Sequence, residues 1–176
     1  ERPAERPPDL AQRQHLDLTA LPLPRDYAEV LSTLLTTPNI ASKEWIYRQY
    51  DSLVGGNTVV QPGSDAAIIR LKESDKGIGM SVDCNSRYCA LDPYRGAAIA
   101  VVESARNLAV SGAKPVALSD CLNFGNPEKP AVMWQFTQAI DGIRDACIAL
   151  DLTVVSGNVS FYNETDGLAI PPTPTI

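Results

Sequence analysis

The sequence predicts an α+β fold, in which a mixed β-sheet has helices packed on one face. Short apolar or β-branched runs, bounded by glycine and proline, are typical of strands. Between them lie two long segments in which apolar residues recur every three or four positions, as in amphipathic helices. The order of strands, helix, strand, helix and strand favours one layered domain.

Length and composition limit the class of protein. The chain has 176 residues, of which 44% are hydrophobic, enough for the core of one domain. The net charge of −6 argues against a general nucleic-acid binder. No apolar run approaches the roughly 20 residues that cross a bilayer, so we expect no membrane segment. The 4 cysteines lack the spacing of a zinc site and predict reduced thiols in a cytoplasmic protein.

The first part of the chain is expected to be an extension of the domain. Residues 1–25 are rich in Pro, Arg, Glu and Gln and lack periodicity, which predicts a flexible arm or linker. We expect the domain itself to span residues 26–176. It starts with a helix from Asp26 to about Leu35, followed by a short helix from Lys43 to about Tyr50 that Ser42 caps.

Strands and two long helices follow. A charged turn, Lys72 to Gly77, is predicted between the second and third strands. The predicted strands are Thr58–Val60, Ala66–Leu71, Ile78–Val82, Val116–Leu118 and Leu152–Val155, with Val159–Tyr162 extended after a turn at Ser156–Asn158. No closing element is expected in residues 168–176.

Each long helix has one apolar stripe that we expect to face the core. The first helix opens at Asp92-Pro93 and ends near Gly112, and the second has Pro130 in its first turn. The stripes comprise Tyr94, Ala97, Ala98, Val101, Val102, Ala105, Leu108 and Ala109, and then Met133, Phe136, Ile140, Ile143, Cys147 and Leu150.

Oxygen-bearing side chains gather around the first long helix. Asp83 follows a strand and enters an irregular loop, and Glu103 and Asn107 lie one helical turn apart. Such ligands suit Mg²⁺, which completes its shell with water and phosphate. The alternatives are a solvated helix face and an ion pair of Asp83 with Arg87. Asp65, at the start of a strand, either faces a ligand or satisfies turn amides.

A second polar segment, SGNVSFYNE, follows a predicted buried strand. Gly157 allows close backbone approach, and Asn158 and Ser160 can bind phosphate or sugar hydroxyls. An ordinary β-turn explains the glycine and the asparagine equally well. The only histidine, His15, lies in the arm, so the sequence has no nucleophile and base pair, and it has no P-loop motif.

The motifs together resemble a known enzyme family. YDSLV, PGSDAA, DCNSRYCALDPYRGA, LNFGNPE, SGNVSFYNET and the closing PPTP are similar to phosphoribosylformylglycinamidine synthase, in the N-terminal-type domain of the second half of its synthetase subunit. That subunit is a tandem duplication within the aminoimidazole ribonucleotide synthetase superfamily. The resemblance covers about residues 38–176.

The resemblance implies a function and a set of site residues. The family uses ATP and Mg²⁺ to convert formylglycinamide ribonucleotide to its amidine, a carbon–nitrogen ligation with ammonia from a glutaminase partner. Asp65, Glu103 and Asn107 fall on metal-ligand positions of an auxiliary site for ATP or ADP, and Asp83 falls where the first half has a metal-binding acid. Arg87 stands where the first half has its catalytic histidine, so we expect no catalytic residue in this fragment.

The resemblance also implies partners. The domain is half of a barrel-forming pair, so we expect it to pack on the remaining synthetase domains and to form a homodimer when isolated. Two alternatives stay open: a stand-alone ATP-dependent synthetase or kinase of the same superfamily, and a structural dimerisation module.

Overall fold

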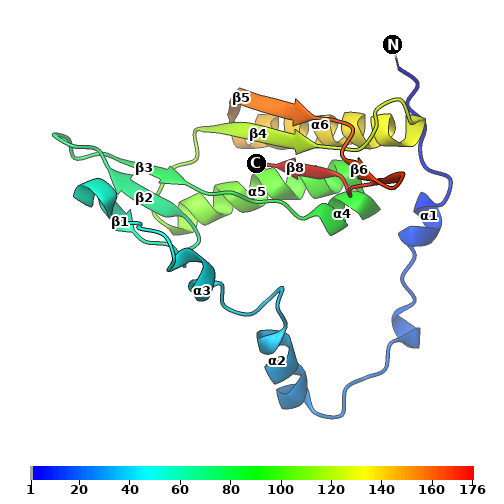
Figure 1. Cartoon of the computed structure of the whole chain (residues 1–176), viewed down its shortest axis with the longest axis horizontal. Coiled ribbons are helices and arrows are strands. Elements are labelled where there is room, and N and C mark those ends of the chain that lie inside the picture. The colour runs from blue at the N-terminus through cyan, green and yellow to red at the C-terminus, as the bar shows by residue number, and fades with distance from the viewer. Residues whose placement is uncertain (1) are drawn as a thin grey trace.

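A mixed sheet packed on two helices forms the centre of the molecule. The computed structural model describes residues 2–176. The sheet has the order β5-β4-β8, and helices α5 and α6 lie together against one of its faces (Figure 1). The bounds are Thr153–Ser160 for β5, Ala117–Asn123 for β4, Thr173–Thr175 for β8, Pro93–Val110 for α5 and Pro130–Leu150 for α6. Strand β4 runs parallel to β5 and antiparallel to β8, so the predicted mixed sheet with helices on one face is confirmed.

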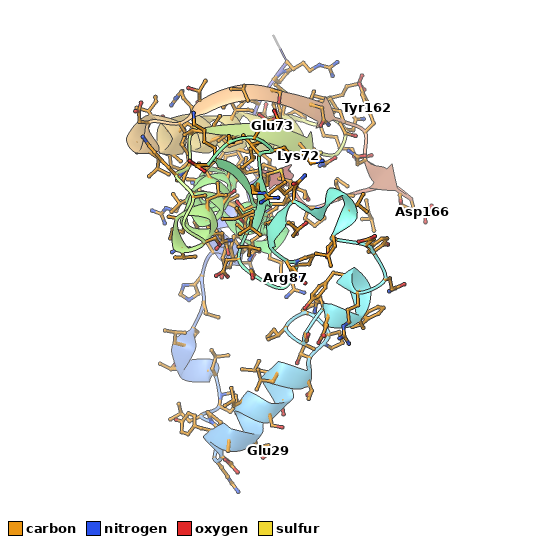
Figure 2. The ribbon with its side chains drawn as sticks, turned by 90° about the vertical axis from the view of Figure 1, so that its left-hand side faces the viewer. Glu29, Lys72, Glu73, Arg87, Tyr162 and Asp166 are labelled. Atoms are coloured by element: carbon orange, nitrogen blue, oxygen red, sulfur yellow. The ribbon has the colours of Figure 1, made fainter. Side chains whose placement is uncertain are left out.

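The first three strands form a separate antiparallel sheet, β1-β2-β3, beside the mixed sheet. Its strands are β1 Thr58–Val60, β2 Ala67–Arg70 and β3 Gly77–Met80, and the charged turn that joins β2 to β3 carries Lys72 and Glu73 (Figure 2). The two sheets meet through two backbone hydrogen bonds of 3.0 Å between Asp83 and Ile176. A small hairpin, β6 Glu164–Thr165 and β7 Leu168–Ala169, completes the strands.

The core lies between the mixed sheet and the two long helices. Phe124 is fully buried, and the ring of Phe136 meets it edge-on at a centroid distance of 5.3 Å. The remaining members are mostly aliphatic and come from both layers: Ala97, Ala100, Val101, Leu118, Leu122, Val132, Ala139, Ile143, Ala146, Cys147 and Ile176.

The buried faces of α5 and α6 are rotated about the helix axes relative to the predicted apolar stripes. In α5, Val102 and Ala109 are exposed, whereas Ala100 and Ser104 are buried. In α6, Ile140 and Leu150 are exposed and small residues take their place. The reason is the close approach of the helices: a β-carbon on Gly142 would lie 2.1 Å from the Tyr94 carbonyl oxygen. Only small side chains fit such an interface.

The N-terminal part contains short helices: α1 Leu10–Arg13, α2 Tyr27–Thr36 and α3 Glu44–Tyr47, with 3-10 turns at Leu18–Ala20 and Val54–Gly56. Helix α2 is confirmed, and the Asp26 side chain caps it by accepting from the amides of Ala28 and Glu29. Helix α3 ends earlier than predicted. Flexibility of residues 1–25 stays a prediction, although Leu10 is 2% exposed in contact with the domain.

Three local predictions are wrong. The expected irregular loop after Asp83 contains a short helix, α4 Ser86–Leu91, which the Asn85 side chain caps. The expected turn at Ser156–Asn158 lies inside β5, because parallel pairing with β4 continues through it. The C-terminal residues do form a closing strand, β8. Pro174 lacks a backbone N–H donor, but β8 tolerates it because β8 is an edge strand of the mixed sheet.

Candidate metal and nucleotide site

Asp83 is held at the point where the two sheets meet. Its backbone pairs with Ile176, and its carboxylate accepts two hydrogen bonds of 3.1 Å from Nδ2 of Asn107. The structure therefore brings together two of the four predicted metal ligands, one from the end of a strand and one from helix α5. The predicted alternative, an ion pair of Asp83 with Arg87, does not occur among residues 2–176, and Arg87 is exposed (Figure 2).

Glu103 lies one helical turn before Asn107, and its negative charge affects the pKa of the Asp83 carboxylate. Burial raises the pKa of Asp83, and the negative charge of Glu103 raises it further, against the hydrogen bond from Asn107 and the charge of Arg106. Glu103 and Asn107 are both partly buried, which fits poorly with a solvated helix face. One carboxylate and one amide of α5 thus lie close to the carboxylate of Asp83, which follows β3.

Two serines that the sequence did not single out fix this arrangement. The hydroxyl oxygens of Ser81 and Ser104 are 2.7 Å apart, and Ser81 also donates to the Ser104 carbonyl at 3.0 Å. Ser104 is 8% exposed. The strand end and the helix are therefore tied one turn before the Asp83–Asn107 contact, which limits how far the carboxylate can move from α5.

Asp65 is not shown to join this group. It is exposed and precedes β2, and no hydrogen bond or ion pair joins it to the other three residues within the described range 2–176. Continuing the β2–β3 register, in which Ala67 faces Met80, by two residues would set Asp65 opposite Val82. That position is one residue from Asp83, and the ligand role of Asp65 remains a prediction.

The donor set fits Mg²⁺ with an incomplete protein shell. Residues 2–176 contain no group of three or more His, Cys, Asp or Glu side chains arranged for a metal. Asp83 and Glu103 would supply carboxylates, and Asn107, whose Nδ2 faces Asp83 here, would supply its amide oxygen; all are hard ligands. Magnesium keeps several waters and is commonly held by one or two carboxylates together with substrate phosphates.

A cavity of about 440 Å³ opens beside this group. It lies between β3, α5 and the mixed sheet, and Ser81, Ser104 and Ile176 belong to its wall. Asn158 lines it as well, so one of the three residues predicted for nucleotide contact lies in the same cavity as the neighbours of Asp83. Asp83, Glu103 and Asn107 do not line the cavity themselves, but their sequence neighbours Val82, Ser104 and Leu108 do.

The other two predicted contact residues have structural partners. A β-carbon at Gly157 would lie 2.3 Å from Oδ1 of Asp120, so the glycine makes room for that carboxylate. The Ser160 hydroxyl contacts the amide of Asn163 at 3.3 Å and 3.1 Å. Their contact with a nucleotide remains a prediction.

The motifs LNFGNPE and SGNVSFYNE bind each other. Nδ2 of Asn163 donates to the carbonyl of Phe124 at 2.9 Å, and the amide of Tyr162 donates to the carbonyl of Gly125 at 3.0 Å. Glu164 accepts from Lys129 at 2.8 Å and from the Asn126 amide at 3.1 Å. Because of these bonds, both motifs have a structural role whether or not they contact a ligand.

A thiol with a lowered pKa lies next to Asp83 in the chain. The hydrogen bond from Cys89 lowers the pKa of Cys84 to about 7, partly opposed by burial and assisted by Thr175. Cys89 is fully buried, and all 4 cysteines are free, as predicted. Sequence reasoning could not find this feature because it depends on α4, which brings the second thiol back to the first.

Comparison with known proteins identifies the family. The model of the AIR synthase related protein, N-terminal domain, matches residues 63–176. The chain belongs to this family. Its sequence is 58% identical over 176 residues to phosphoribosylformylglycinamidine synthase subunit PurL of Moorella thermoacetica, and 56% identical over 170 residues to that of Alkaliphilus metalliredigens. These matches cover 100% and 97% of this chain but 24% and 23% of the relatives, so the chain spans about a quarter of their length.

Solved structures agree with the sequence matches. A structure of PurLQS from Thermotoga maritima superposes with a TM-score of 0.72 at 36% identity, covering 77% of this chain and 23% of that one. T. maritima PurL complexed with ATP gives a TM-score of 0.68 at 35% identity, covering 77% and 22%. The α+β architecture of this chain is therefore that of the AIR synthase-like fold. Among the described residues, no helix has the length and apolar character needed to cross a membrane.

Proposed function

We propose that this chain is the N-terminal-type domain of the second half of a PurL-type synthetase, and that it holds a nucleotide through Mg²⁺ next to Asp83. The observation that supports it most is the meeting of Asp83, Glu103 and Asn107 beside the 440 Å³ cavity. Related PurL structures contain ATP and ADP. Bound Mg²⁺ supplies positive charge that offsets the charge of phosphate oxygens.

The residues of this chain orient the ligand and perform no chemical step on it. Asp83 and Glu103 would hold the metal, with the amide oxygen of Asn107 and the carboxylate of Asp65 as further ligands. Asn158 lies in the wall of the cavity, and Gly157 and Ser160 support the strand from which it projects. The whole protein would be a cytoplasmic carbon–nitrogen ligase of purine biosynthesis that receives ammonia from a glutaminase subunit or domain.

A scaffolding role is the second candidate, because one apolar sheet face lacks a cover. Ile69 and Ile78 are paired across β2 and β3, and with Met80 and Val82 they are 37%, 48%, 48% and 77% exposed. Such a patch is typical of an interface. We propose that the other synthetase domains cover it in the whole protein, as half of a barrel, and that isolated copies dimerise through it.

A chimera tests the proposed function. Residues 1–176 would replace the matching quarter of the Moorella thermoacetica relative, and formation of formylglycinamidine ribonucleotide would be measured. We expect activity to be retained, and Glu103→Gln within the chimera to weaken it by roughly tenfold or more through loss of a charged ligand. Arg87→Gln, an exposed change nearby, is the control for folding only. A folded but inactive chimera with its native Glu103 would contradict the proposal.

A further inference from the structure

The N-terminal arm lines a second cavity, which shares no lining residue with the first. This cavity is about 850 Å³ and lies between the arm, the junction of α4 with α5, and the first half of α6. None of the predicted metal or nucleotide residues lines it. Its most distinctive lining side chains are Arg6, Arg13, His15, Arg95, Trp134 and Gln138.

The arm wall of this cavity is fixed by hydrogen bonds and by burial. Arg13 donates to the Ala90 carbonyl at 3.2 Å, and Gln14 donates to the Leu91 carbonyl at 2.6 Å. The amide of Glu5 bonds the Pro130 carbonyl at 3.1 Å, and Leu10 is 2% exposed. These contacts hold the arm against α4 and the start of α6 and so keep the wall of the cavity together.

Positive charge is concentrated in the cavity of an otherwise acidic chain. Three arginines line it and Asp92 is the one carboxylate among the lining residues, whereas the whole chain has a net charge of −6. Arg13 is engaged by Asp9 at 3.0 Å. Arg95 meets Asp92 only at 3.6 Å, with 81% of its side chain exposed, and Arg6 meets the neutral Gln14 at 3.4 Å.

Arg6 and Arg95 therefore keep unused donors. A guanidinium has five N–H donors in a planar fork that matches phosphate oxygens. Trp134 adds an aromatic surface to the same cavity, and aromatic side chains can stack on a nucleobase. A ligand that combines phosphate groups with a flat ring would use both features.

We propose that this arm cavity binds a phosphate-bearing anion, with Arg6 and Arg95 contacting its phosphate oxygens. The site is separate from the Mg²⁺ site and needs no metal. Pyrophosphate and ADP share the chemistry that the arginines recognise, and Trp134 would favour ADP through its base.

Calorimetric titration of the 176-residue chain with pyrophosphate and with ADP, in EDTA and 0.15 M NaCl, tests the proposal. EDTA removes the metal, so binding here is independent of the first site, and Glu103→Gln is expected to leave it unchanged. Arg6→Gln and Arg95→Gln should each weaken binding by roughly tenfold, because each loses a charge-assisted hydrogen bond. Arg87→Gln is the matched control, since Arg87 is exposed on α4 and does not line the cavity.

The two ligands separate the sources of the anion. Equal affinities would assign the site to the phosphate groups alone, and tighter ADP binding that Trp134→Leu removes would assign it to a nucleotide. Absence of heat with both ligands at millimolar concentration would overturn the proposal. Affinities that are the same in the wild type, Arg6→Gln, Arg95→Gln and Arg87→Gln would also overturn it.

Discussion

Replacing Gly142 by alanine tests the close packing of α5 on α6, on which the position of Glu103 and Asn107 depends. The new β-carbon would lie 2.1 Å from the carbonyl oxygen of Tyr94 and 2.9 Å from its carbon. Ordinary contact begins near 3.4 Å, so the helices must separate by more than an ångström. The atoms in the way belong to the backbone, which cannot rotate aside.

The magnitude follows from two opposed effects. Alanine favours the helix over glycine by about 1 kcal/mol. Overpacking a core costs about 1–3 kcal/mol and occasionally more. Because the displacement here exceeds an ångström and involves backbone, we expect overpacking to dominate and the free energy of unfolding to fall by about 2 kcal/mol. For a chain of this length that lowers Tm by about 4–8 °C.

Thermal and urea unfolding followed by circular dichroism measure the effect. Ile148→Ala is the matched control, because Ile148 lies on the same helix and is 73% exposed. It should change the free energy of unfolding by less than about 0.5 kcal/mol. A Gly142→Ala protein that is more stable than the wild type by about 1 kcal/mol would show that helix propensity alone governs the site. The described approach of α5 and α6 would then be refuted.

Two further predictions concern titrating groups. Alkylation of Cys84 should accelerate as the pH rises through about 7, because the thiolate is the nucleophile. Cys89→Ala should move the midpoint of this pH dependence upward, as measured by peptide mass spectrometry. An unchanged midpoint would show that Cys89 does not lower the pKa of Cys84. The hydrogen bond from Lys129, followed by that from the Asn126 amide, lowers the pKa of Glu164. The charged Glu164 therefore stabilises the folded state at neutral pH, and this contribution is lost as the pH falls through the lowered pKa. Glu164→Gln should be less stable than the wild type at pH 7 but not in acid, and a difference that persists at low pH would contradict the role of the charge.

The element types were largely predictable from sequence because they follow from local patterns. Asp26, Pro93 and Pro130 marked helix starts correctly, and the apolar runs marked most strands. The boundaries of the apolar stripes were not predictable. Helix packing through Gly142 selects small buried residues, and periodicity gives weight to large ones.

The candidate site was only partly predictable. The i, i+4 spacing identified Glu103 and Asn107, and the strand end identified Asp83. Their meeting depends on the pairing of Asp83 with Ile176, far along the chain, and on the Ser81–Ser104 contact. The turn assigned to Gly157 and Asn158 failed because strand pairing with β4 overrides local turn preference.

Binding of ADP to the chain with and without Mg²⁺, measured by calorimetry, tests the metal-dependent site most directly. The metal-dependent part of binding is taken as the difference from the titration in EDTA. We expect Asp83→Asn and Glu103→Gln each to weaken that part by roughly tenfold or more, with Arg87→Gln unchanged. Metal-dependent binding that survives in both variants, with their folds intact, would contradict the assignment of these carboxylates.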